Sequence, residues 1–140
     1  MWKYYAILSA VFAALTAIFA KIGIKNIDSN LATAIRTCVI LLLTWGIVFA
    51  SNTISGIKEL TRINWLFLIL SGVATGLSWL FYFKALQLGD ASKVAPIDKL
   101  SVAFTILLSF IILKETVSWR VVAGGLLIVA GSIVILMDKQ

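Results

Sequence analysis

Long apolar runs alternate with short polar stretches along the whole sequence, and there are five such runs. A helix needs about 20 largely apolar residues to cross the hydrocarbon core of a bilayer, and the runs approach that length. They lack the two-residue alternation of strands in a membrane β-barrel. We therefore predict an all-α integral membrane bundle of five transmembrane helices. The predicted helices cover residues 4–20, 31–50, 65–86, 91–113 and 119–137.

Polar residues and a proline mark the boundaries of these helices. The polar stretch 25–30 predicts a loop, and the longer linker 51–64 is expected to be partly helical at the membrane surface. Pro96, the only proline, falls in the first turns of the fourth helix. There its missing N–H group is either tolerated or bends the helix.

The composition is that of a protein dissolved in lipid. Of the 140 residues, 61% are hydrophobic, whereas an ordinary globular domain is about 45–50% apolar. Five spans use nearly the whole length, so we expect one membrane domain over residues 1–140 and no separate catalytic domain. The first apolar run is long and lacks a convincing cleavage site, so we interpret it as a retained helix rather than a signal peptide. The expected location is the cell (cytoplasmic or inner) membrane.

The charged and reactive residues exclude several classes of function. The net charge is +6, but the basic residues stand singly at segment ends, so anionic lipid headgroups rather than nucleic acid are the expected counter-charge. The sequence has no histidine and one cysteine, Cys38, which leaves no disulfide framework and no thiolate and imidazole metal cluster. Phosphate-binding glycine loops and catalytic triads are also missing. We therefore expect no catalytic residues, no enzyme activity, no cofactor and no metal.

The basic residues are divided evenly between the two membrane surfaces. Side one receives the N-terminus, the linker between the second and third helices, and the connection between the fourth and fifth. Its five basic residues are Lys3, Lys58, Arg62, Lys114 and Arg120. The five on side two are Lys21, Lys25, Lys84, Lys93 and Lys139. Because the Lys and Arg bias of short loops sets orientation, an even count predicts that both orientations are made.

Two basic residues inside helices leave a second outcome open. If Arg36 and Lys99 are counted with side two, the balance becomes five against seven and the N-terminus faces outward. If instead both orientations coexist, two copies can pair about an axis in the membrane plane and form an inverted-repeat transporter of ten helices. A uniformly oriented parallel dimer and a subunit of a heteromer are the alternatives.

Several short motifs occur in a characteristic order. They are Lys21 at the end of the first helix, Arg36 early in the second, 83–86 at the end of the third, 95–96 and 113–115 around the fourth, and 124–131 in the fifth. In their order and spacing, the chain resembles over its whole length one half of an EamA-type protein of the drug/metabolite transporter superfamily. This resemblance implies a five-helix repeat that moves small organic metabolites, commonly outward, or a lipid-linked sugar in the flippase branch.

The chain also departs from its apparent relatives. Most of them carry two repeats in one chain, and many have uncharged residues where Asp98 and Lys99 stand here. The first helix contains no membrane-embedded glutamate, so the chain also differs from the four-helix small multidrug resistance proteins. Neither their carboxylate mechanism nor any relative's substrate is therefore transferred to this chain.

The fourth helix carries the leading candidate for a solute path. Asp98 lies seven residues after Ala91, about 10 Å into the helix at 1.5 Å per residue, which is too deep for a short side chain to reach water. Charges inside lipid usually mark a pathway. Asp98, Ser101, Thr105 and Ser109 follow at helical spacing and form a polar stripe. The alternative for Asp98 is a structural ion pair with Lys84, Lys99 or Arg36.

Other candidates have a functional and a structural interpretation. Lys99 either lines the path or extends to the headgroups. Arg36 either contacts solute or braces the bundle. Trp79 and Tyr82 either form an aromatic wall for a cationic or flat solute or pack within the bundle.

These observations favour a secondary transporter. We expect a dual-topology homodimer that exports small organic metabolites by alternating access, with proton coupling through Asp98 as one option, and with lipids and a small solute as its other partners. The alternative is a small subunit of a lipid-linked sugar flippase or of another non-enzymatic heteromeric membrane complex. A structural or chaperone-like membrane protein without a solute path is a third interpretation.

Overall fold

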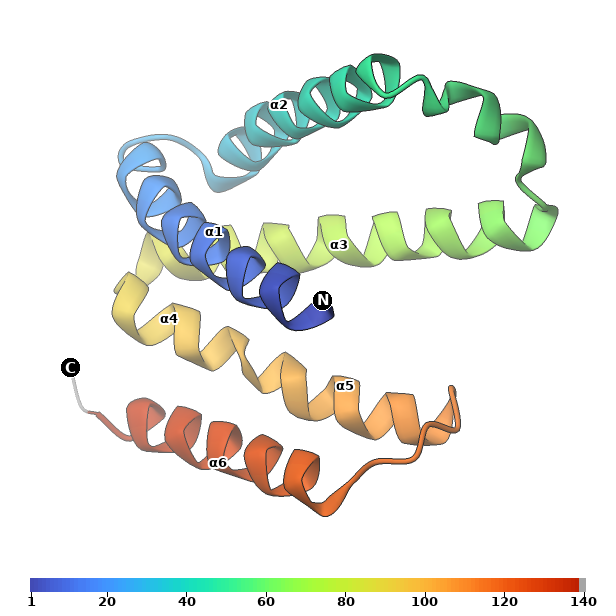
Figure 1. Cartoon of the computed structure of the whole chain (residues 1–140). Coiled ribbons are helices and arrows are strands. Elements are labelled where there is room, and N and C mark those ends of the chain that lie inside the picture. Colours follow the sequence, from blue (N-terminus) through green and yellow to red (C-terminus); the bar gives the residue numbers. More distant parts are fainter. Residues whose placement is uncertain (139–140) are drawn as a thin grey trace. The chain divides into compact units, whose positions relative to one another are not determined.

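The computed structural model describes residues 1–138, and all regular elements within them are helices (Figure 1). Five segments are long and apolar enough to cross a membrane, with residues 91–111 forming one of them. The all-α class and the five spans are therefore confirmed. Lys139, which was counted on side two, lies outside the described residues. The elements are α1 (Trp2–Gly23), α2 (Ser29–Ala50), η1 (Thr53–Glu59), α3 (Arg62–Leu88), α4 (Ala91–Asp98), α5 (Leu100–Ile111) and α6 (Trp119–Leu136).

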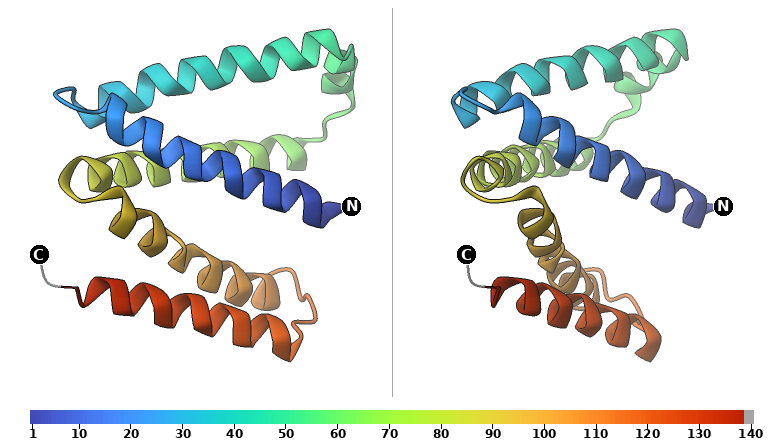
Figure 2. Two further views of the ribbon diagram at one scale, coloured as in Figure 1. Left: turned by 60° about the vertical axis from the view of Figure 1, so that its left-hand side comes forward. Right: turned by 90° about the vertical axis from the view of Figure 1, so that its left-hand side faces the viewer.

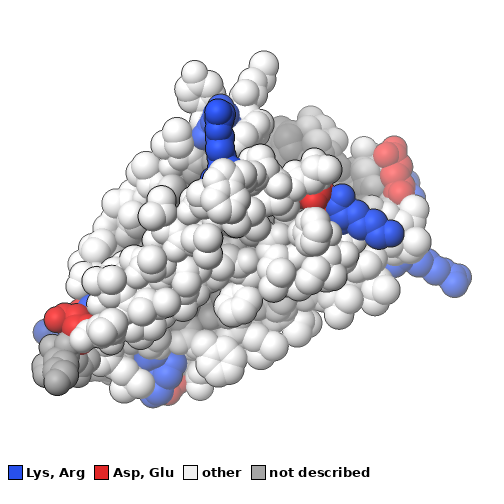
Figure 3. Space-filling model, turned by 90° about the horizontal axis from the view of Figure 1, so that it is seen from below, with Lys and Arg blue, Asp and Glu red and all other residues white. Residues whose placement is uncertain are grey.

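The chain divides into two compact units. One comprises Met1–Phe19 and Leu88–Gln140, and the other comprises Ala20–Gln87. The face drawn in Figure 3 is mostly uncharged, with Lys and Arg in a few separate places. An apolar surface of this kind is what a lipid-dissolved protein presents to the bilayer.

In the unit Ala20–Gln87, side-chain hydrogen bonds join the beginning of α2 to the end of α3. The Asp28 carboxylate accepts from the backbone N–H groups of Asn30 and Leu31 and caps α2. Nε2 of Gln87 donates to the carbonyl of Ile27 over 2.8 Å, and Nζ of Lys21 donates to the carbonyl of Leu86 over 2.7 Å. The start of α2 and the end of α3 therefore lie on the same side of the membrane, as the alternation of spans requires.

The linker between α2 and α3 holds the short helix η1, and α3 begins at Arg62, earlier than the predicted residue 65. The side chains of Thr61 and Asn64 bond to each other, and the backbone N–H of Asn64 donates to the hydroxyl of Thr61. This reciprocal arrangement resembles a capping box, which satisfies N–H groups that a helix start leaves free. Residues 62–64, predicted to belong to the linker and including the polar Arg62 and Asn64, therefore form the first turn of the helix.

In the other unit, α6 packs against both α4 and α5 (Figure 2). A Cβ atom built on Gly125 of α6 would lie 2.8 Å from Cδ1 of Ile106 in α5, so any larger residue would displace that side chain. Nζ of Lys93, near the start of α4, lies 2.7 Å from the carboxylate of Asp138, just beyond α6. The start of α4 and the end of α6 are therefore at the same membrane surface.

The fourth apolar run, predicted as one helix over 91–113, consists of two helices that meet at Lys99. Pro96 has no N–H group to continue the helical ladder. Its carbonyl accepts from the N–H of Lys99 at 3.0 Å, which is the tighter i to i+3 pattern. At the other end, α5 stops at Ile111, and Lys114 then adopts a left-handed conformation with φ 55°.

Candidate functional site

Arg36 of α2 lies against aromatic rings of α3. The centre of its guanidinium is 4.2 Å from the ring centroid of Trp79 and 5.1 Å from that of Phe83. Tyr82 interacts electrostatically with Arg36, and its ring meets that of Phe83 edge-on at 6.3 Å. Residues 79, 82 and 83 are spaced by three and four and so share one face of α3. We call these four residues the Arg36 cluster.

The Arg36 cluster lies well inside the membrane span. Arg36 is seven residues after the start of α2 at Ser29, which corresponds to about 10 Å along the helix. Trp79 is nine residues before the end of α3 at Leu88, or about 13 Å. The guanidinium lies on these rings within the segment that the apolar residues define as a span, and cation–π attraction is stronger in a desolvated place.

Asp98 and Lys99 form an ion pair at the break between α4 and α5. Nζ of Lys99 is 3.3 Å from a carboxylate oxygen of Asp98, and both side chains are partly exposed. Asp98 closes α4, and Ser101, Thr105 and Ser109 belong to α5. The predicted polar stripe is thus interrupted at Lys99 and does not run along one continuous helix.

Two hydroxyl groups of the stripe, those of Thr105 and Ser109, donate to carbonyls of their own helix. Thr105 donates to the carbonyl of Ser101 over 2.8 Å, and Ser109 donates to the carbonyl of Ile106 over 3.0 Å. A hydroxyl that bonds back in this way uses its proton and keeps its acceptor lone pairs. Toward a solute, Thr105 and Ser109 therefore offer acceptors, which suit ammonium or hydroxyl groups.

Ser132 of α6 holds the break in place from the side. Its buried hydroxyl lies 3.0 Å from the carbonyl of Pro96 and 2.9 Å from that of Ile128, so its single proton is shared between them. In a regular α-helix the carbonyl of Pro96 would accept from the N–H four residues later. Here it accepts from the N–H of Lys99 and from the hydroxyl of Ser132. Sequence reasoning did not include Ser132 among the candidates, although it is a polar side chain within an apolar helix.

The seven predicted site residues thus fall into two groups. Asp98, Lys99, Ser101 and Thr105 lie in the unit that contains α4 and α5, and Arg36, Trp79 and Tyr82 lie in the unit Ala20–Gln87. The structure joins Arg36 to Trp79 and joins Asp98 to Lys99. Sequence reasoning missed Phe83, whose position four residues after Trp79 is the signal that could have identified it.

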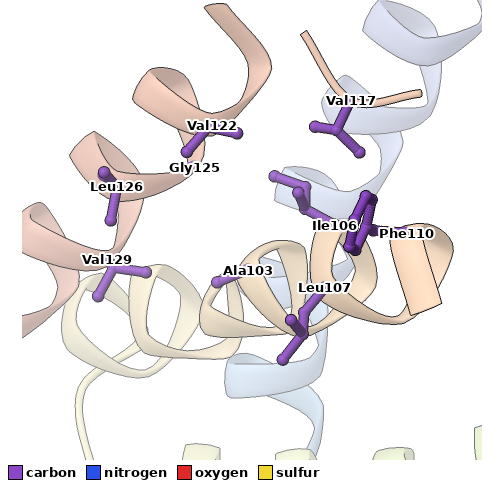
Figure 4. Close-up of a pocket in the computed structure, with 9 residues that line it drawn as sticks. All are labelled: Ala103, Ile106, Leu107, Phe110, Val117, Val122, Gly125, Leu126 and Val129. Atoms are coloured by element: carbon purple, nitrogen blue, oxygen red, sulfur yellow. The ribbon is translucent and has the colours of Figure 1, made fainter. Parts of the chain in front are cut away.

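A cavity of about 460 Å³ opens between α5 and α6 (Figure 4). Its lining, which includes Ile106, Phe110 and Val122, is entirely apolar. A wall without hydrogen-bonding side chains cannot orient a polar solute. This cavity is therefore a poorer candidate for solute binding than the Arg36 cluster or the break at Lys99.

An all-helical, multi-pass bundle with charged side chains inside its spans has the general design of a membrane transport protein rather than of an enzyme. The chain belongs to the EamA-like transporter family, whose profile matches residues 1–137. The resemblance inferred from the sequence is thereby confirmed, and so is the expected membrane location. The activity of this class is the transport of small solutes across a membrane.

Three relatives are similar to this chain over more than nine-tenths of its length, and they differ in how much of their own length the match covers. An uncharacterised transporter of Sinorhizobium is 47% identical over 96% of this chain and 95% of its own length. An uncharacterised protein of Methanocaldococcus jannaschii is 31% identical over 92% and 91%. Human solute carrier family 35 member G1 is 30% identical over 93% of this chain but only 35% of its own length. No solved structure matches the chain.

Proposed function

We propose that this protein is a secondary transporter that exports small organic metabolites by alternating access as a dual-topology homodimer. The observation that carries the proposal is the odd number of spans in a chain that matches two relatives over nearly their whole lengths and a third relative over part of its length. The chain has five spans and matches two relatives over nearly their whole lengths, while it covers about a third of the human relative. A second copy of a five-span unit in one chain is automatically inverted, and separate copies reach the same architecture by inserting in opposite orientations.

The even distribution of basic residues supports the two orientations. With five Lys and Arg on each side, counting Lys139 from the sequence, the insertion machinery has little to distinguish the surfaces. Two contacts agree with the assignment of helix ends to side two. Lys93 at the start of α4 pairs with Asp138 beyond α6, and Gln87 near the end of α3 bonds to Ile27 just before α2.

The break at Lys99 supports alternating access. In secondary transporters, interrupted helices near the substrate commonly supply both binding groups and a point of bending. Asp98 can exchange Lys99 for a proton or for a cationic group of the solute, which would couple solute movement to proton movement. Ser101 and Thr105 continue the proposed path along α5.

Reporter fusions at the C-terminus test the dual topology. We expect both alkaline phosphatase, active only outside, and a fluorescent protein, active only inside, to give a signal at comparable expression levels. A five-span protein with a strong charge bias serves as the single-orientation control. If only one reporter is active, the antiparallel dimer is wrong.

A further inference from the structure

The Arg36 cluster contains a cation without a charged partner of its own unit. Within the described residues of Ala20–Gln87, no acidic residue pairs with the Arg36 guanidinium, which interacts with the rings of Trp79 and Phe83 and with Tyr82. The two acidic residues of this unit are Asp28, which caps α2, and Glu59 in η1 at the other end of the helix. Neither is placed to neutralise Arg36.

Neither Trp79 nor Phe83 has a side-chain oxygen or nitrogen that could accept from the N–H groups of the Arg36 guanidinium. A guanidinium carries five N–H donors in a rigid planar fork and no acceptor. Two parallel N–H groups of such a fork match the two oxygens of a carboxylate. N–H groups inside the membrane raise the free energy of the protein unless a hydrogen-bond acceptor is present for them.

The same geometry reverses the charge expected of the solute at this point. Trp79 and Tyr82 alone would suit a cationic or flat solute, since aromatic faces attract cations. Arg36 already covers the face of Trp79, so a second cation would meet repulsion from the guanidinium. A flat anion gains both the charge of Arg36 and contact with the partly exposed rings of Trp79 and Tyr82, whereas Phe83 is buried.

We propose that the Arg36 cluster binds the carboxylate of a planar or aromatic organic acid. The inference rests on the proposed transport function and assigns the class of solute that α2 and α3 recognise. The depth of the cluster favours a solute over a lipid headgroup, because Trp79 lies about 13 Å from the end of α3, below the level of the phosphates.

Three probes of equal shape and different charge test the proposal on the purified full-length protein. Benzoate, benzyl alcohol and benzylammonium are titrated while tryptophan fluorescence is followed in nanodiscs of phosphatidylcholine. The variant Trp79→Phe keeps an aromatic ring and shows whether Trp79 gives the signal. We expect saturable binding of benzoate, at least about tenfold weaker binding of benzyl alcohol, and none of benzylammonium.

Variants separate the charge of Arg36 from its shape. Arg36→Gln should weaken benzoate binding at least about tenfold, and Arg36→Lys should fall between, because lysine keeps the charge but lacks the planar pair of donors. Arg62→Gln, at the exposed start of α3, is the matched control and should bind benzoate as the unaltered protein does. Equal binding of benzoate by Arg36→Gln, or preferred binding of benzylammonium, overturns the proposal.

Two further measurements test whether another anion occupies the Arg36 cluster, and either positive result would overturn the proposal. If phosphatidylglycerol in the nanodisc abolishes benzoate binding, the occupant is a lipid headgroup. If benzoate binds only to Asp98→Asn, the partner of Arg36 is a carboxylate of the protein. Binding is measured without transport, so a protein that binds benzoate through Arg36 but shows a single topology would refute the proposed dimer and leave this inference standing.

Discussion

Asp98 and Lys99 are neighbours in the sequence, and their ion pair spans the junction of α4 and α5. A partly exposed pair of this kind contributes about 0–1 kcal/mol to stability. Because the ion pair is weak, Asp98 can exchange Lys99 for a proton or for a group of the solute during a transport cycle. The pair is thus better suited to coupling than to holding the fold together.

The first prediction is that Asp98→Asn uncouples proton movement while leaving the protein assembled. The amide keeps the shape of the side chain but does not take up a proton in the accessible pH range. The assay uses proteoliposomes with an internal pH dye and the solute that gives the largest efflux in a screen of labelled organic acids, amino acids, amines and sugars. We expect the solute-driven pH change to disappear and the elution volume of the dimer to stay the same.

Asp138→Asn is the matched control for this experiment. Asp138 is also a carboxylate paired with a lysine, but it follows α6 at the membrane surface. It should therefore retain the solute-driven pH change. A normal pH change in Asp98→Asn would remove Asp98 from the coupling mechanism.

At the scale of single residues, sequence reasoning identified charges more readily than their partners. Arg36 and Asp98 stand out because charged groups are rare in apolar runs. Phe83 does not stand out, since an aromatic residue in a membrane helix is ordinary and only the fold shows that Arg36 lies over its ring. Within its own unit, Asp98 pairs with its sequence neighbour Lys99.

Among the elements, the junction of α4 and α5 departs most from the helix pattern of the sequence. The apolar periodicity continues through residue 99 and predicts one helix, and Pro96 permits either a tolerated turn or a bend. In the structure the helix is interrupted, and Ser132 of α6 donates a hydrogen bond to the carbonyl of Pro96. A contact between residues 36 positions apart is not visible in local sequence, which is why the sequence alone leaves both outcomes open.

The second prediction is that Ser132→Ala loosens this junction. Loss of one buried hydrogen bond costs about 1 kcal/mol, so we expect the thermal midpoint in detergent to fall by a few degrees. Hydrogen exchange should become faster in peptides covering residues 97–102, where the helical ladder is already interrupted, and remain the same over residues 104–110.

Ser118→Ala provides the control for the loss of a hydroxyl from the same segment of chain. Ser118 precedes α6, is exposed, and makes no side-chain capping hydrogen bond. Its replacement should leave both the midpoint and the exchange of residues 97–102 unaltered. Equal exchange in Ser132→Ala and Ser118→Ala would show that Ser132 does not stabilise the junction.

For the whole molecule, the order and number of spans followed from the sequence because apolar runs of sufficient length have few alternatives in lipid. The assembly of copies of the chain could not be derived from the sequence in this way. Large apolar side chains such as Phe104, Leu107 and Phe110 are exposed on α5, and both lipid and a second copy can cover such a surface. Orientation depends on a small difference in the number of basic residues on the two sides, so a few substitutions that add Lys or Arg to one side are expected to fix it.

The third prediction uses two variants with opposite charge bias. Glu59→Lys with Glu115→Lys raises the basic count of side one from five to seven, and Asn30→Lys with Ser92→Lys does the same for side two. All four positions are exposed, at or near the ends of spans. We expect each double variant to insert in one orientation and to lose efflux of the screened solute by at least about tenfold, because an antiparallel dimer needs both orientations.

Expressing the two double variants together should restore efflux to roughly half of the original level or more, since oppositely oriented copies can again pair. Reporter fusions on each variant verify the fixed orientation, and the unaltered protein at matched expression sets the reference level of efflux. Full efflux from either double variant by itself would identify a parallel dimer or a monomer as the working form. Failure of the pair to recover, with both orientations verified in the same membrane, would equally refute the antiparallel homodimer.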